Sequence, residues 1–270
     1  MKELIQLFLD HMRADKAASE NTILAYRGDL KHFWVDLTNT QGQEIGVESI
    51  DANMIAAYLN RIQQVFAPAT VARRMASLHV FFEFLRSGGW IILNPAQELK
   101  ATVVKLKPLP TLSVSQLEKL LTQVRSRRTP VFPQADRDIA MIELLYSTGL
   151  RITELVALNI GDVDTSERVL VCTSSESWVR QIPFREQAAV ALDNYLKEPR
   201  TRLLRGRKET ALFVNRRGER LSRQGFWINL KHYAENASIA NVSAQVLRRT
   251  FAAHQLRTAL ERGPKTTWAL

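Results

Sequence analysis

The chain has 270 residues, of which 46% are hydrophobic and 24% charged, and it carries a formal net charge of +10. This composition is typical of one or two folded domains and excludes a disordered chain. No apolar run approaches the ~20 residues that a membrane helix requires, and the N-terminus lacks the small-residue cleavage site of a secretory signal. The lone Cys172 cannot form an internal disulfide. We therefore expect a cytoplasmic protein with no membrane partner.

Residues 1–100 are predicted to form an N-terminal helical domain, because apolar residues recur there at helical spacing in four successive segments. Ser19 and Asp51 can cap the second and third helices. Pro68 suits the first turn of the fourth helix, and Gly88 marks its end. The aromatic residues on the apolar faces are interpreted as core residues rather than as ligand contacts.

A linker and a second, mixed domain are predicted after the first. Residues 101–112 combine prolines and lysines without a sustained period, which is typical of an exposed linker. Helical signal resumes at Ser113, which has capping-box spacing to Gln116, so the second domain is predicted over 113–270. The pattern indicates a mainly α fold with a small β-sheet. We expect helices over about 113–125, 136–147 (starting at Asp136), 185–197, 222–236 and 243–260 (ending at Gly263), a hairpin of strands 168–173 and 179–184, and a short strand over 211–214.

The excess positive charge lies in a single part of the chain. Residues 200–262 contain fourteen Arg or Lys and four Glu, and twelve of the fourteen cations are Arg. Arg binds phosphate through parallel donors, so a concentrated basic face favours nucleic acid as the partner. The alternative is a solvated surface that maintains solubility. The sequence has no Cys or His metal motif and no phosphate-binding Gly loop, and we expect no cofactor.

Two arginines occupy unusual positions next to apolar residues at helix starts. Arg151 lies in STGLRITELVALNIGDVD (147–164) and Arg248 in SAQVLRRTFAAH (243–254). Two guanidiniums near helix N-termini can clamp one phosphate, because each offers two parallel donors and the helix ends add positive potential. Glu154, one helical turn after Arg151, can fix its guanidinium. The alternative is that both arginines form structural salt bridges.

These stretches resemble the tyrosine recombinase or phage integrase family, particularly its bacterial Xer-type members. LLYSTGLRITELVALNIGDVD and VLRRTFA occur in that order behind a helical domain that contains SENTILAYRGDLKHF and APATVARRMASLHVFFEFL. The resemblance covers almost the whole chain. It implies an N-terminal SAM-like core-binding domain and a catalytic-type α+β domain that together clamp double-stranded DNA, with Arg151 and Arg248 on the phosphate.

The resemblance also implies a chemistry for which several residues are replaced. In the family, a tyrosine attacks a backbone phosphate, a lysine on the hairpin protonates the leaving 5′-oxygen, and His or Trp side chains assist, without metal or nucleotide. The lysine's place falls on Ser175 in this chain. The first His is Gln245, an amide that cannot act as a general base near neutral pH, and Arg249 stands where the family often has a second His.

The nucleophilic tyrosine and the family's third motif are expected to be absent. After Arg248 the sequence has 22 residues and no tyrosine. Tyr233 lies in the middle of a predicted amphipathic helix and is not a replacement, while His254 is interpreted as a packing residue and Thr266 and Thr267 lack a positioned base. All five tyrosines of the chain precede Arg248: Tyr26, Tyr58, Tyr146, Tyr195 and Tyr233.

Three functions follow as hypotheses. The first is a DNA-binding member of the family that cannot cleave DNA alone and that acts beside an active recombinase. The second is a recombinase subunit whose nucleophile comes from a partner chain, and the third is a non-functional truncated relic. Besides the two phosphate-binding arginines, the residues expected to contact DNA are Arg180, Arg216, Arg217, Arg223, Arg249, Arg73 and Arg74.

Overall fold

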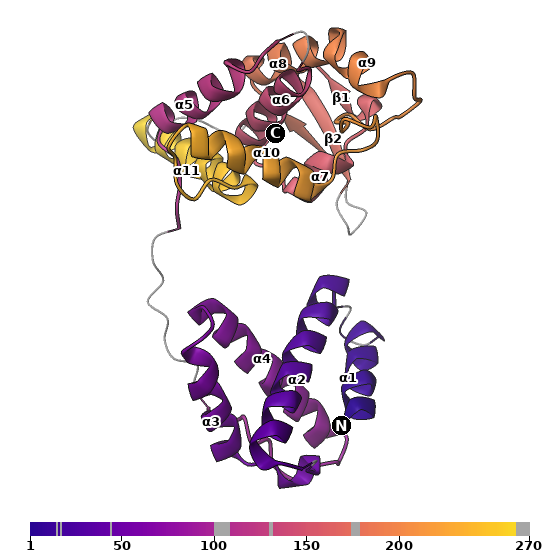
Figure 1. Ribbon diagram of the computed structural model, residues 1–270, viewed down its shortest axis with the longest axis vertical. Coiled ribbons are helices and arrows are strands. Elements are labelled where there is room, and N and C mark those ends of the chain that lie inside the picture. Colours follow the sequence, from indigo (N-terminus) through magenta and orange to yellow (C-terminus); the bar gives the residue numbers. More distant parts are fainter. Residues whose placement is uncertain are drawn as a thin grey trace. The chain divides into compact units, whose positions relative to one another are not determined.

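The computed structural model divides the chain into two compact units, Met1–Lys107 and Pro108–Leu270 (Figure 1). Within the part of the chain that it describes, no helix combines the length and apolar character needed to cross a membrane. Part of the predicted linker, residues 101–108, falls outside that description. The residues described are 1–14, 16, 18–43, 45–99, 109–129, 132–173 and 179–262.

The N-terminal unit consists of helices around an aromatic core. Phe8, Phe33, Phe81 and Phe82 are buried, and the rings of Phe8 and Phe81 meet edge to face with their centroids 5.4 Å apart. The aromatic faces are therefore core, as predicted. The elements are α1 (Lys2–Ala14), α2 (Glu20–Gln41), the 3-10 helix η1 (Val47–Ser49), α3 (Ala52–Gln63) and α4 (Pro68–Ser87).

Local signals in the sequence set the starts of these helices. The Ser19 side chain accepts the Thr22 N–H at 3.2 Å at the start of α2, and Asp51 accepts the Met54 N–H at 2.8 Å at the start of α3. Pro68 occupies the first turn of α4, where a backbone N–H has no intrahelical partner. The four predicted helices are confirmed in their number and order.

The C-terminal unit packs helices and a three-stranded antiparallel sheet around one central helix (Figure 1). The sheet order is β1-β2-β3, and the β2–β3 pair is the predicted hairpin, with Thr173 opposite Val179. The elements are α5 (Val114–Arg125), α6 (Gln134–Thr148), α7 (Ile152–Ala157), η2 (Ile160–Asp162), β1 (Val163–Asp164), β2 (Val169–Thr173), β3 (Val179–Pro183), α8 (Glu186–Lys197), α9 (Pro199–Leu204), α10 (Arg223–Asn236) and α11 (Ala244–Arg262).

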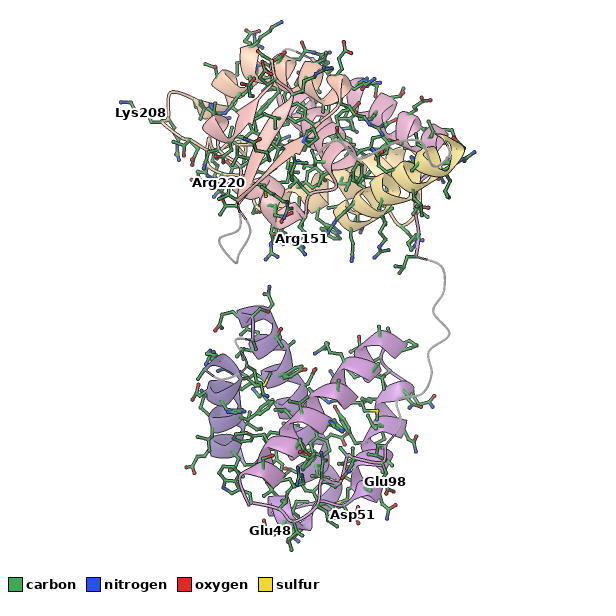
Figure 2. The ribbon with its side chains drawn as sticks, turned by 180° about the vertical axis from the view of Figure 1, so that it is seen from behind. Glu48, Asp51, Glu98, Arg151, Lys208 and Arg220 are labelled. Carbon is green, nitrogen blue, oxygen red and sulfur yellow. The ribbon has the colours of Figure 1, made fainter. Side chains whose placement is uncertain are left out.

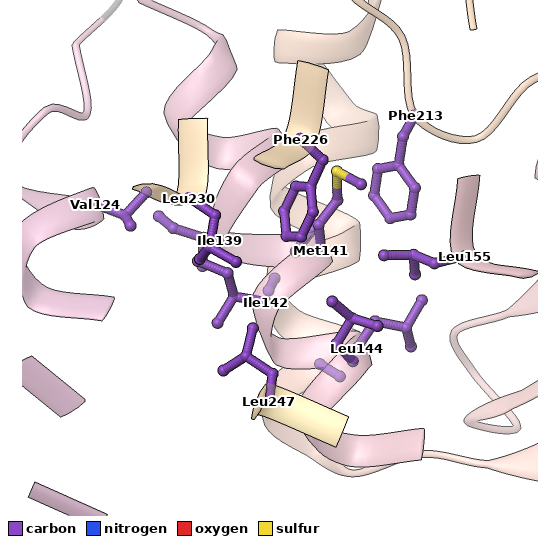
Figure 3. Packing of buried hydrophobic residues seen from close by; sticks show 14 of the residues in the cluster. Val124, Ile139, Met141, Ile142, Leu144, Leu155, Phe213, Phe226, Leu230 and Leu247 are labelled. Atoms are coloured by element: carbon purple, nitrogen blue, oxygen red, sulfur yellow. The ribbon is translucent and has the colours of Figure 1, made fainter. Parts of the chain in front are cut away.

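The central helix is α6, whose residues are almost all buried. Figure 3 shows Ile142 and Leu144 of α6 packed among side chains that come from other helices. Among these are Phe226 of α10 and Leu247 of α11, which are buried to 1% and 0% exposure. The position of α11, and with it of Arg248, is thus fixed by the core.

Two local predictions differ from the structure. Residues 211–214 are buried but form no strand, because each end makes only a single bridge, Ala211 to Asn159 and Val214 to Arg220. The helix predicted to start at Asp136 is α6, and it begins at Gln134 instead. The Asp136 carboxylate does not cap it but forms an ion pair with Arg128 at 2.5 Å. The predicted helix end at residues 263–264 lies outside the described residues.

Candidate nucleic-acid interface

A left-handed turn at Gly149 presents Arg151 between α6 and α7. Gly149 has a φ of +64°, and its N–H donates to the Leu145 carbonyl at 2.9 Å, a conformation that favours glycine. A Cβ on this residue would lie 2.5 Å from the ring of Phe251 on α11. Leu150 then enters the core, and Arg151 starts α7 in an extended conformation. Both the backbone and the close ring require glycine here.

Glu154 joins Arg151 to Arg180. Its Oε2 accepts the backbone N–H of Arg151 at 2.7 Å, which caps the helix. Its Oε1 accepts Nη2 of Arg180 at 2.9 Å and Nη1 of Arg151 at 3.4 Å. Arg180 lies on β3, opposite Cys172 of β2. One carboxylate therefore ties the start of α7 to the hairpin and brings two guanidiniums together.

The carboxylate is buried while both guanidiniums reach solvent. The side chain of Glu154 is 7% exposed, against 58% for Arg151 and 44% for Arg180. Burial favours a raised pKa for Glu154, but the hydrogen bond from the Arg151 N–H and the charges of Arg180 and Arg151 outweigh it, so the pKa lies below its ordinary value. An ionised Glu154 faces two cations, which leaves an excess of positive charge at the surface. Arg151 thus has a supporting ion pair and an open head group.

Arg248 lies on the exposed side of α11. This helix packs against α6, and Phe251, one helical turn after Arg248, lies against Gly149. The segment that carries Arg248 therefore adjoins the turn that presents Arg151. Within the described residues, no acidic side chain pairs with Arg248.

Gln245 and Arg249, which the family resemblance predicts at histidine positions, both lie on α11. Gln245 is exposed in the first turn of α11, one turn before Arg248, and Arg249 is half-buried. An amide offers a donor and an acceptor but no proton-accepting base. Ser175 lies outside the described residues, and so do Thr266 and Thr267.

The tyrosines of the C-terminal unit are held by the fold. Tyr195 is fully buried, and burial raises its pKa to about 12. Tyr233 is buried and donates to Asp138 at 2.9 Å. Tyr146 is half-buried, and its hydroxyl lies 2.9 Å from Nδ1 of His254. Among the described residues, no cluster of three or more His, Cys, Asp or Glu could hold a metal ion.

A second group of predicted DNA contacts surrounds the start of α10. Arg216 and Arg217 are exposed on a turn that closes at Gly218, whose φ is +77°. Arg223 is the exposed first residue of α10, whose N-cap is Ser222. All three residues are exposed, and the guanidinium of Arg216 lies over the Phe132 ring at 5.2 Å from its centroid.

The two arginines predicted to bind DNA in the N-terminal unit differ from each other. Arg73 is exposed and pairs with the buried Asp29. Arg74 is buried, stacks over Phe66 at 4.0 Å and donates to the Tyr58 hydroxyl at 3.2 Å. A guanidinium enclosed in this way cannot reach a backbone phosphate without opening the unit. The expectation that Arg74 contacts DNA is therefore corrected, since its place is in the core.

Three arginines that the sequence did not single out bind main-chain carbonyls. Arg137 donates to the Val214 carbonyl at 2.9 Å, and Arg200 donates to the Leu212 and Ala211 carbonyls at 3.2 and 2.6 Å. Arg220 binds carbonyls at the end of α7. Nothing in composition or spacing distinguishes these arginines from those on the surface.

Comparison with known proteins places both units in one family. Residues 110–261 match the phage integrase family, and residues 5–89 match the phage integrase N-terminal SAM-like domain. The chain is 36% identical over 274 residues to the tyrosine recombinase XerC of Roseiflexus castenholzii, covering 97% of this chain and 82% of the relative. The chain belongs to the phage integrase family of tyrosine recombinases. The resemblance seen in its sequence is confirmed.

A further relative agrees with this family membership, and two solved structures share the fold. Tyrosine recombinase XerD of Pseudomonas putida is 35% identical over 260 residues, covering 94% of this chain and 83% of the relative. A lambda integrase dimer bound to a COC′ core site has a TM-score of 0.73 at 17% identity, covering 96% of this chain and 87% of that one. The Tn1549 transposon integrase in complex with a circular intermediate DNA has a TM-score of 0.71 at 19% identity, covering 95% and 87%. The predicted fold class, a SAM-like helical domain followed by an integrase catalytic domain with a small sheet, is confirmed.

Proposed function

We propose that this chain binds double-stranded DNA in site-specific recombination, and that it does not cleave a DNA strand by itself. The observation that carries the proposal is the sharing of Glu154, which caps the Arg151 main chain and accepts from the Arg180 guanidinium, and so brings two exposed guanidiniums to one point of the surface. Such fixed donors lose little freedom on binding a phosphate, and charge-assisted bonds to phosphate are strong. Arg248 adds a third guanidinium on the adjoining helix.

The basic surface around α10 supports a duplex as the ligand. Arg216, Arg217 and Arg223 are exposed, so the phosphate contacts need not be limited to one point. Phosphate contacts of this kind supply affinity and register rather than sequence preference. The solved structures of the lambda and Tn1549 integrases, which contain DNA, support the same partner for this chain. We propose an active recombinase of the same family as the protein partner.

The proposal that the chain does not cleave alone depends on the replaced residues. Gln245 supplies no base, and Ser175 stands where the family has the lysine that protonates the leaving oxygen. A serine hydroxyl is a far weaker acid than an ammonium ion, so it cannot replace that proton donor. Both replacements lie inside continuous sequence, away from its C-terminal end. The competing function is a subunit whose nucleophile arrives from a partner chain.

Duplex binding is tested by fluorescence anisotropy across a salt series. We expect a linear fall of log affinity against log salt with a slope of about −0.9 for each neutralised phosphate. Arg151→Ala and Arg248→Ala should each weaken binding by ~1–3 kcal/mol and reduce the steepness of that slope by about one. Arg86→Ala is the matched control, because it removes the same charge from an exposed i,i+3 ion pair in the N-terminal unit. A flat salt response would refute DNA binding and favour the relic.

Strand cleavage is tested separately with a nicked suicide duplex. We expect no covalent protein–DNA adduct from the chain alone. An adduct that disappears in Tyr146→Phe would refute the proposal and identify the tyrosine next to His254 as a nucleophile. Under the shared-nucleophile alternative, the covalent bond would join the DNA to the tyrosine of an added active recombinase, and this adduct would be lost when this chain carries Arg151→Ala.

A further inference from the structure

Helix α7 is too short to be stable by itself. It spans Ile152–Ala157, six residues, whereas an isolated helix in water needs roughly 12–15 residues. Its last carbonyls have no intrahelical donors. The orientation of α7 therefore depends on the groups that bind its two ends. Glu154 supplies those contacts at the start, and Arg220 supplies them at the end.

The guanidinium of Arg220 binds the carbonyl oxygens at the C-terminal end of α7. Nη1 lies 2.9 Å from the carbonyl oxygen of Val156, 2.8 Å from that of Ala157 and 3.1 Å from that of Leu158. Nη2 donates to Oδ1 of Asn159 at 2.6 Å. A cation at a helix C-terminus also complements the negative end of the helix dipole. The carbonyls left open by the short helix are thereby satisfied.

The main chain of Arg220 is itself anchored in the core. The residue forms a bridge with Val214, and the N–H of the next residue, Leu221, donates to the Phe213 carbonyl at 2.9 Å. Val214, Phe213 and Leu221 are buried. The guanidinium therefore links a fixed core segment to a helix more than sixty residues earlier in the chain. Figure 2 labels both Arg220 and Arg151.

The two ends of α7 are mechanically coupled because the helix has fewer than two turns. Arg151 leads directly into the first turn, which Glu154 caps. A shift at the Arg220 end would move the short helix as a whole and change the direction in which the Arg151 guanidinium points. Arg180 reaches Glu154 from β3, so its main chain is held by the sheet and not by α7.

We infer that Arg220 is a positioning residue, which holds α7 so that Arg151 presents its guanidinium to a DNA phosphate. The inference rests on the proposed function. It assigns Arg220 a role that acts through Arg151 and not through its own contact with DNA. Its side chain is committed to four oxygen acceptors of the protein, which leaves it poorly placed to bind a phosphate as well.

A double-mutant cycle in duplex affinity tests this role. Arg220→Lys keeps the charge, but one ammonium group cannot reproduce the fork that spans three carbonyls and an amide. We expect Arg220→Lys to weaken binding about tenfold, the effect of losing one well-placed charged bond. In an Arg151→Ala background, the same substitution should change affinity less than about twofold, since the group it positions is gone. Arg207→Lys, at an exposed pair with Glu219, is the matched control and should change little.

Each outcome decides for or against the inference. Equal losses in both backgrounds would show that Arg220 binds DNA directly, and unchanged affinity with a lower melting temperature would show a purely structural role. Either result overturns it. Absence of duplex binding by the unmodified protein overturns the proposed function and the inference with it. Hydrogen exchange at the Leu158 amide, expected to be faster in Arg220→Lys, reports separately whether the side chain holds α7.

Discussion

Replacing Glu154 tests the support beneath the two exposed arginines. Glu154→Ala removes the acceptor of the Arg151 N–H, a cap worth about 1 kcal/mol and at most about 2. It also removes the 2.9 Å charge-assisted bond from Arg180, worth about 1 kcal/mol because that guanidinium is partly exposed. The 3.4 Å contact with Arg151 is long and adds little. We expect the free energy of unfolding of the C-terminal unit to fall by about 2–3 kcal/mol.

Glu154→Gln is the matched variant, because its amide oxygen can still accept the Arg151 N–H. It should lose only the charge, about 1 kcal/mol at pH 7. The pKa of Glu154 is lowered in the folded protein, so its charge stabilises the fold above the unfolded pKa of about 4.3. This contribution is lost as the pH falls through the folded pKa. The difference between the native protein and Glu154→Gln should therefore vanish in acid.

Urea unfolding at pH 7 and in acid measures these stabilities, and anisotropy measures duplex affinity on the same samples. The two explanations of DNA binding predict opposite signs for Glu154→Ala. If net positive charge alone governed binding, removing a carboxylate would tighten it. If Glu154 orients Arg151 and Arg180, binding should weaken although the net charge rises. Tighter binding, or equal stability of all three proteins, would refute the reasoning.

Three further predictions concern the scaffold of the site. Gly149→Ala should destabilise the protein by more than about 1 kcal/mol, because it adds a Cβ at positive φ against the Phe251 ring; Gly161→Ala, with open space around it, is the control in thermal unfolding. Glu143→Gln should raise the melting temperature at pH 7 but not near pH 4. Burial raises the pKa of Glu143, although the charges of two nearby arginines lower it, so the ionised form of Glu143 weakens the fold. Leu247→Ala should cost about 2–5 kcal/mol in urea unfolding, since the side chain is fully buried.

The helices of the N-terminal unit could be predicted because their signals are local. A cap such as Ser19 or Asp51 acts within three residues of itself, and an apolar stripe needs only the helix period. The hairpin of β2 and β3 was predicted for the same reason, since its strands are close in the chain. The segment 211–214 was mistaken for a strand because its apolar run is a core segment with single-residue bridges.

Of the contacts in the site, the sequence predicted only those between residues of the same motif. Glu154 lies three residues from Arg151, so the spacing anticipated its contact with the Arg151 guanidinium at 3.4 Å, but not the shorter bond of 2.7 Å to the Arg151 N–H. Arg74 and Arg220 could not be assigned, because their partners are 16 and about 60 residues away in sequence. An arginine in the sequence is known to carry a charged guanidinium. Only the tertiary structure decides whether that guanidinium binds a carbonyl, a carboxylate or water.

Because some arginines bind groups of the protein itself, only part of the positive charge of residues 200–262 is available to bind DNA phosphates. Arg200 is buried against carbonyls, and Arg220 is committed to α7. Four more cations pair with acids on the surface, which they must leave before they can bind DNA. The salt dependence should therefore correspond to fewer phosphates than the fourteen cations of this stretch. The exposed cations with no acidic partner among the described residues are Arg205, Lys208, Arg216, Arg217, Arg223 and Arg248, and these should dominate the slope.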